Sequence, residues 1–220
     1  MQVNVKEKTS QAQKAYYAIE EMIVSLKLKP GTKLSEKSLC QMLGMGRTPV
    51  REALLRLSTE GTVLVSPRSG ITISQIDIKD QFRVLEIMRP LERILVERSA
   101  VFATSEERDR FAELADQFQR AADSEDESLF LAADREFNQL LAVSAHNRHA
   151  VLISTFLHTH SRRFLYLYFK QFGDLRQICS LHANIALAIA RQDRAGAKSS
   201  SDALIDYSEA FATIVAKMVS

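Results

Sequence analysis

The sequence predicts a mainly α-helical protein in two parts: a small helical N-terminal part that ends in a β-hairpin, and a C-terminal bundle made only of helices. Apolar residues recur at helical spacing through most of the 220 residues, and alternating apolar residues are confined to 63–73. Charge also divides the chain. Residues 1–75 hold 11 Lys and Arg against 6 Glu, whereas the remainder holds 18 basic and 21 acidic residues.

Length and composition fit an ordinary globular protein of two small domains or one large one. Apolar runs are only a few residues long, which argues against a membrane span, and the N-terminus does not resemble a signal peptide. Cys40 and Cys179 are isolated thiols within helical patterns, which favours buried thiols in a reducing compartment. We therefore expect a cytoplasmic protein without a membrane partner.

The N-terminal part begins with two helices. The first runs from Ser10 to about Leu26. Ser35 can cap a second helix, and Gly44 can end it. Their inward faces are formed by residues at helical spacing: Tyr16, Ile19, Ile23, Leu39 and Leu43.

A third helix follows the short turn at residues 44–46. Thr48 at the N-cap and Pro49 at the first helical position are strong helix-start signals. Apolar positions of this helix (Val50, Ala53, Leu54 and Leu57) point inward. With those residues facing the core, Arg47 and Arg51 lie on the outward face of the helix, and Arg56 is a third candidate for that face.

Two helices joined by a tight turn place the N-terminus of the second one in a DNA major groove. Arg51, one turn into this helix, can contact a guanine edge with two hydrogen bonds. Arg47, Thr48 and the nearby backbone amides suit phosphates. The basic charge of this part fits the same partner, although Lys-rich helix surfaces and a simple helical hairpin with solvated arginines remain alternatives.

Two short strands complete this part of the chain. Val63 and Val65 precede a turn, and Ile71 and Ile73 follow it. The hairpin forms a wing that offers Arg68 to a minor groove or a phosphate. Gly70 permits close approach of the backbone to DNA. The elements together predict a winged helix-turn-helix.

The segment PGTKLSEKSLCQMLGMGRTPVREALLRLSTEG closely resembles the DNA-binding domain of GntR-type transcription regulators. The resemblance covers roughly residues 10–75, and we place this domain at 8–75. Family members commonly have Ser just before the Arg of the RTPVREAL core. Gly46 stands there in this chain, which removes one hydroxyl that could bind phosphate.

Only helices are expected after the hairpin. Their predicted ranges are 78–102, 105–122, 125–145, 148–171, 174–192 and 194–218. We assign 78–218 to one all-helical domain for effector binding and dimerisation, since a bundle of this size can surround a pocket.

This second domain resembles the effector domain of the FadR subfamily, on the pieces MRPLE (88–92), DREFN (134–138) and LHANI (181–185). The resemblance implies a divalent metal held by one Asp and three His. Asp134 and His182 match that pattern, whereas Asn138 and Leu204 stand where two further His are expected. One carboxylate, one imidazole and one amide make a poor transition-metal site. No cofactor is therefore expected, and a weakly bound divalent metal on Asp134 and His182 is the remaining possibility.

Arg89 lies in an apolar helical pattern and is followed by Pro90, which can kink the helix. The resemblance implies that Arg89 faces the pocket and binds a carboxylate or phosphate. The alternative is a salt bridge to Glu86 or Glu92. Asn138 could bind an organic effector. Either Arg162 or Arg163 could also face the pocket, because helical phase does not decide between them. The other histidines (His146, His149, His158 and His160) are expected to be surface or packing residues.

These observations predict a ligand-responsive transcription regulator, and the family resemblance implies that it is a repressor. It would bind a palindromic double-stranded DNA operator as a homodimer. Its helical domain would bind a small anionic effector, an organic acid, through Arg89, Asp134, Asn138 and His182. An effector-free architectural DNA-binding protein is the main alternative. A metal-dependent enzyme with a DNA-binding head is weaker, because nucleophile elbows, phosphate loops and zinc motifs are absent.

Overall fold

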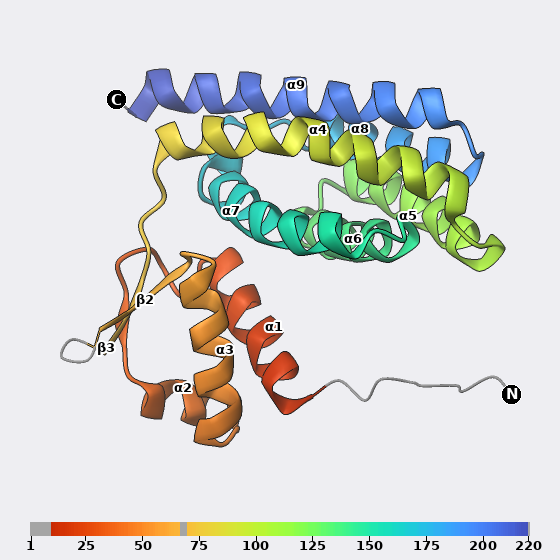
Figure 1. The fold of residues 1–220 in the computed structure, drawn as a ribbon. Coiled ribbons are helices and arrows are strands. Elements are labelled where there is room, and N and C mark those ends of the chain that lie inside the picture. Colours follow the sequence, from red (N-terminus) through yellow and green to blue (C-terminus); the bar gives the residue numbers. More distant parts are fainter. Residues whose placement is uncertain (1–9, 67–69, 220) are drawn as a thin grey trace, which may run out of the picture. The chain divides into compact units, whose positions relative to one another are not determined.

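A computed structural model of the protein describes residues 10–66 and 70–219. The chain divides into two compact units, the first ending at Ile76 and the second beginning at Asp77 (Figure 1). Within the described residues, no helix is long and apolar enough to cross a membrane.

The described residues of the first unit form three helices: α1 (Gln11–Val24), α2 (Glu36–Leu43) and α3 (Arg47–Thr59). The predicted cap of α2 at Ser35 is present, and Ser10 caps α1 in the same way. The side chain of Ser10 accepts a hydrogen bond from the backbone of Gln13, and Ser35 accepts one from the backbone of Ser38. Gly44 ends α2 in the left-handed conformation, with φ of 62°.

The start of α3 differs from the prediction. Its N-cap is Gly46 rather than Thr48, and Arg47 is the first helical residue. Pro49 therefore occupies the third helical position. Its missing N–H is harmless there too, because the first four amides of a helix have no partner inside the helix.

The wing is a three-stranded antiparallel sheet rather than a two-stranded hairpin. Its strands are β1 (Lys33–Leu34), β2 (Val63–Ser66) and β3 (Gly70–Ile73), with β3 in the centre. Leu34 pairs with Ile71, and Val63 pairs with Ile73. The sequence does not reveal β1, because two residues are too few to form an alternating pattern.

Six helices form the second unit, as predicted, and each predicted end lies within two residues of the observed one. They are α4 (Ile78–Phe102), α5 (Ser105–Ser124), α6 (Glu127–Ser144), α7 (Arg148–Phe172), α8 (Leu175–Ala190) and α9 (Arg194–Val219). Helix α4 continues through Pro90.

The six helices surround a core rich in aromatic side chains. Helix α4 lies along α9, and α5 packs along α8 (Figure 1). Phe118 contacts Phe130 and Phe137 with ring centroids about 6 Å apart, which joins α5 to α6. The core shared by these helices also positions the polar side chains of the pocket between them.

Candidate nucleic-acid interface and ligand pocket

The N-terminal turn of α3 presents polar side chains to solvent. Arg47, Thr48 and Arg51 are all exposed, and they border the same surface hollow together with Val65. Arg51 is 78% exposed, and its Nε lies 3.7 Å from Oε1 of Glu36, which is a weak surface contact. Gly46 gives no side-chain cap, so the first backbone amides of α3 are open to an anion.

Arg56 does not point outward. Its guanidinium lies 3.7 Å from the ring centroid of Tyr16, and its Nε donates to Oε1 of Glu60 at 3.0 Å. The hydroxyl of Tyr16 donates to the other oxygen of Glu60 at 2.9 Å. Arg56 therefore joins α3 to α1, and its guanidinium is engaged within the first unit rather than directed at DNA.

The two residues predicted for the wing, Arg68 and Gly70, differ in what the structure says about them. Arg68 lies outside the described residues. Gly70 has φ of +77°, and a Cβ at this position would lie 2.8 Å from the backbone oxygen of Leu34. The need for glycine is thus explained within the sheet, where β3 approaches β1. Close approach to DNA is not required to account for it.

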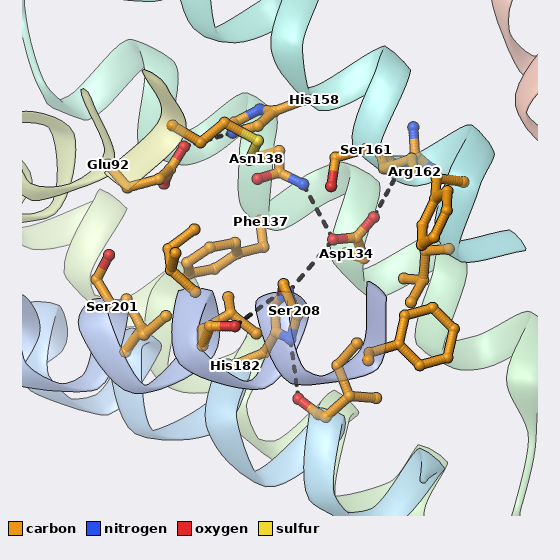
Figure 2. Close-up of a pocket in the computed structure, with 18 of the residues that line it drawn as sticks. Glu92, Asp134, Phe137, Asn138, His158, Ser161, Arg162, His182, Ser201 and Ser208 are labelled. Atoms are coloured by element: carbon orange, nitrogen blue, oxygen red, sulfur yellow. Dashed lines mark hydrogen bonds and ion pairs between the residues drawn. The ribbon is translucent and has the colours of Figure 1, made fainter. Parts of the chain in front are cut away.

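The second unit contains a pocket of about 70 Å³ between α4, α6, α7, α8 and α9 (Figure 2). Three of the four residues predicted for the effector site, Asp134, Asn138 and His182, line it together. Leu204 also lines it and fills space, as its side chain implies. The remaining wall combines apolar residues with polar ones, among them Met88, Phe137, Ile205, Glu92, His158, Ser161 and Arg162.

Asp134 is the centre of the polar network. Its Oδ2 accepts a hydrogen bond from Nε of Arg162 at 2.7 Å, and its Oδ1 accepts one from Nδ2 of Asn138 at 3.0 Å. Nε2 of His182 lies 3.4 Å from the same Oδ1. Burial alone would raise the pKa of Asp134, but Arg162, His182 and His158 outweigh it and lower the pKa to about 2. The carboxylate is therefore ionised at neutral pH.

His182 is held in a fixed orientation. Its Nδ1 donates to the backbone oxygen of Ile178 at 2.9 Å, which directs Nε2 toward Asp134. The imidazole is surrounded by the rings of Phe118, Phe130 and Phe137, with centroid distances of 5.0–5.8 Å. These contacts fix the ring where it can donate to, or accept from, a group in the pocket.

A second buried pair lines another part of the pocket. Nε2 of His158 lies 2.6 Å from Oε1 of Glu92, and both side chains are about 11–12% exposed. Burial lowers the pKa of His158, but the charge and hydrogen bond of Glu92 have a larger combined effect and raise it. The raised pKa favours the protonated imidazole, which pairs with the carboxylate of Glu92 in this part of the wall.

Arg89 is not a lining residue, and the prediction that it faces the pocket is wrong. Its Nη2 donates to Oδ1 of Asp206 at 2.7 Å and lies 3.1 Å from Oε2 of Glu209. The predicted alternative also misidentified the partners, because these acidic residues belong to α9 rather than to α4. Asp202, Asp206 and Glu209 are spaced to form an acidic face on α9, which attracts Arg89 to the outer seam between the two helices.

The residues present do not fit the divalent metal that the effector-domain resemblance implies. Both oxygens of Asp134 are engaged, and the nearest cation is a guanidinium that would repel a metal ion. Asn138 directs its amide N–H toward Asp134 instead of offering a lone pair there. Within the described part of the chain, no three His, Cys, Asp or Glu are grouped so that they could hold a metal.

Arg162, His158 and Glu92 are the pocket residues that sequence reasoning missed or left undecided. Arg162 lines the pocket, whereas Arg163 is buried outside the pocket lining. The sequence does contain a pattern that indicates Arg162: His158 and Arg162 are four residues apart, so they share one face of α7. Combining that spacing with the Asp134–Asn138 spacing on α6 would have favoured Arg162.

Comparison with protein families assigns both units. Residues 11–73 match the model of the bacterial regulatory proteins of the gntR family, and residues 83–207 match that of the FCD domain. The second match alone covers more than half of the chain.

Individual relatives agree with this assignment. The chain is 28% identical over 135 residues to YdhC, an HTH-type transcriptional regulator of Bacillus subtilis strain 168, and that match spans 61% of this chain and 60% of YdhC. It is 25% identical over 181 residues to the transcriptional repressor RspR of Escherichia coli K12, covering 82% of this chain and 79% of RspR.

The fold also matches a solved structure, that of E. coli McbR/YncC, with a TM-score of 0.78. The two share 22% identity over 93% of this chain and 97% of the other, so this likeness supports the fold alone. From the family matches and the relatives, we conclude that the chain belongs to the GntR family of bacterial regulatory proteins, with an FCD domain after its helix-turn-helix, and is a DNA-binding transcription regulator.

Proposed function

We propose that this regulator is a homodimeric, ligand-responsive repressor whose effector is a small organic acid bound in the pocket of the second unit. The observation that carries this proposal is a pocket in which Arg162, Asp134, Asn138 and His182 converge beside apolar side chains. Binding sites for small molecules combine such an apolar lining with a few fixed polar groups. The name of RspR as a repressor supports the proposed direction of regulation.

The proposed DNA contacts lie on the exposed face of α3. Arg51 would contact a base edge in the major groove, while Arg47 and Thr48 would contact phosphates. Arg68 remains our proposed wing contact. A two-fold symmetric operator would place one α3 in each half-site, which is the reason for proposing a homodimer. The site of action would be the cytoplasm, where bacterial DNA lies.

A ligand can change operator affinity only if it binds the DNA-competent and DNA-incompetent arrangements with different affinities. The buried ion pairs are suited to this, because a bound carboxylate would redistribute the hydrogen bonds of Arg162 between helices α6 and α7. An effector-free architectural role would require no such group of buried charges beside a pocket, so we place it second.

The proposal is tested on the full chain in two steps. Selection from a random DNA library identifies the operator, and fluorescence anisotropy then measures its affinity with and without a panel of organic acids. We expect at least one acid to weaken operator binding at least tenfold, and sedimentation to give a dimer. Unchanged affinity across the panel, together with no thermal stabilisation by any acid, would leave the effector-free role as the better account.

A further inference from the structure

The pocket is lined by matched charges rather than by an excess of one sign. Its carboxylates are Asp134 and Glu92, and its cationic groups are Arg162 and His158. Each carboxylate lies against one cation, at 2.7 Å for Asp134 with Arg162 and 2.6 Å for Glu92 with His158. His182 adds an imidazole that faces Asp134. The two carboxylates are thus matched by these two paired groups before any ligand enters.

This balance disfavours a ligand that carries only negative charge. Its carboxylate would have to share Arg162 with Asp134, and nothing else in the ligand would offset the negative charge that it adds to the pocket. Asp134 keeps its own charge engaged in the pocket wall, because Arg162 and Asn138 both donate hydrogen bonds to it. Burying an unmatched charge is costly.

A metal ion cannot restore the balance here. The family arrangement would place a divalent cation beside Asp134, but Arg162 already donates to this carboxylate and Asn138 directs an N–H at it. Leu204 lines the pocket where a further ligand would be needed. The second positive charge therefore has to come from the ligand.

We propose that the pocket binds a small zwitterion without a metal ion, holding the ligand's carboxylate with Arg162 and its ammonium group with Glu92. This inference rests on the proposed function, because it takes the pocket to be the effector site. Glu92 is the better partner for the ammonium group. Within the described residues it contacts His158 through Oε1, whereas both oxygens of Asp134 are already engaged.

The shape of the pocket separates the two charges of the ligand. Figure 2 shows the Glu92–His158 pair on one side of the view and the Asp134–Arg162 pair on the other. Apolar side chains that include Phe137 and Met88 line the same pocket. A short methylene chain between the carboxylate and the ammonium group suits this lining, so the proposed ligand carries its amino group at the end of the chain rather than on the α carbon.

The test is isothermal titration of the full chain, dialysed against EDTA, with probes of matched length. The zwitterions are the ω-amino acids from 3-aminopropanoate to 6-aminohexanoate. The comparison probes are pentanoate, glutarate, pentylammonium and 2-aminopentanoate, an isomer of 5-aminopentanoate. We expect one ω-amino acid to bind at least tenfold more tightly than every comparison probe, with no gain from added Zn²⁺ or Mn²⁺.

Variants then assign the two ends of the ligand. Glu92→Gln should reduce the affinity for the best ω-amino acid at least tenfold, to that of pentanoate, while leaving pentanoate itself unchanged. Arg162→Gln should weaken both probes. Arg89→Met, which removes a cation outside the pocket lining, is the matched control and should bind all probes as the unmodified chain does. The probe series on the unmodified chain tests the inference even if Arg162→Gln folds poorly.

The inference is overturned if pentanoate or glutarate binds as tightly as every ω-amino acid, if a metal is required, or if no ω-amino acid binds. The proposed function survives those results when another compound weakens operator binding. Conversely, tight binding of an ω-amino acid supports the inference even if no compound changes operator affinity, a result that would remove only the proposed ligand response.

Discussion

Nε of Arg162 donates to Oδ2 of Asp134 at 2.7 Å, and the two side chains are only 10% and 6% exposed. The bond joins α7 to α6 at the wall of the pocket. Neither charge is well solvated, so each depends on the other. We therefore expect this ion pair to contribute to the stability of the second unit and to the choice of ligand proposed for its pocket.

Arg162→Met should therefore destabilise the fold more than a surface substitution would. Removing one member of a buried ion pair typically costs about 3–5 kcal/mol, because the other charge is left without its partner. Urea unfolding, followed by circular dichroism, measures this cost. Arg162→Met combined with Asp134→Asn should recover part of it. If the double variant loses the sum of the two single losses, the two side chains are not coupled.

Stability should depend on pH at both ends of the neutral range. The pKa of Asp134 is about 2 in the folded chain, below its ordinary value of 3.8, so its contribution is present above about pH 4 and is lost as pH falls toward 2. It is on the order of 2 kcal/mol. The pKa of His158 is raised above 6.5, so its contribution is present below that value and is lost as pH rises through the raised pKa.

Urea unfolding between pH 3 and pH 9 checks both changes. His158→Gln should abolish much of the alkaline decline and leave the acidic one in place. An alkaline decline of the same size in His158→Gln would show that some other group causes it.

On the DNA side, Arg51→Ala should weaken operator binding by about 1–3 kcal/mol and relax the preference at one base pair. Arg47→Ala should weaken binding more evenly across sequences and make its salt dependence shallower. Anisotropy titrations on the operator and on single-base variants distinguish the two effects. Arg83→Ala, an exposed arginine of α4, serves as the control. Full operator affinity in Arg51→Ala would contradict the proposed placement of α3.

Tyr16→Phe should destabilise the first unit by about 1 kcal/mol, because it removes the hydrogen bond from the hydroxyl to Glu60. Arg56→Ala should cost at least as much, since the guanidinium also lies over the ring of Tyr16. Thermal unfolding is the measurement, and Tyr17→Phe, on a half-exposed neighbouring ring, is the control. Equal stability of Tyr16→Phe and Tyr17→Phe would show that the bond contributes little.

A zinc site should be recoverable by substitution. Asn138→His with Leu204→His supplies two imidazoles beside Asp134 and His182, which gives a donor set suited to Zn²⁺. The guanidinium of Arg162 should still oppose the metal. Adding Arg162→Gln should therefore tighten zinc binding further, by at least tenfold in a chelator competition. If zinc binds the unmodified chain stoichiometrically, the assessment of its donor set is wrong.

Local patterns predicted most of the fold. The cap at Ser35, the end of α2 at Gly44 and the six C-terminal helices all follow from neighbouring residues in the chain. The errors arose where an element was too short to form a pattern, or where two nearby residues could each begin a helix. Strand β1 has only two residues, and at the start of α3 both Gly46 and Thr48 are residue types that occur at N-caps.

The candidate ligand pocket was predictable only in part. Asp134, Asn138 and His182 were identified from their motifs, and they do line one pocket. Arg89 was misplaced because its acidic partners lie more than a hundred residues away on α9. His158 and Glu92 gave no signal singly, since neither residue type is unusual at a helical position.

The sequence by itself determined the element order, the winged helix-turn-helix and the helical bundle, because caps, turns and apolar periodicity act between residues close in the chain. Tertiary structure alone decided which buried charges meet. It placed Arg162 rather than Arg89 in the pocket and paired Glu92 with His158. Which side chains meet depends on the rotation of each helix about its axis relative to helices that are distant in sequence. Inside the poorly polar core, the rotations that bring opposite charges together are favoured, and no local sequence pattern encodes them.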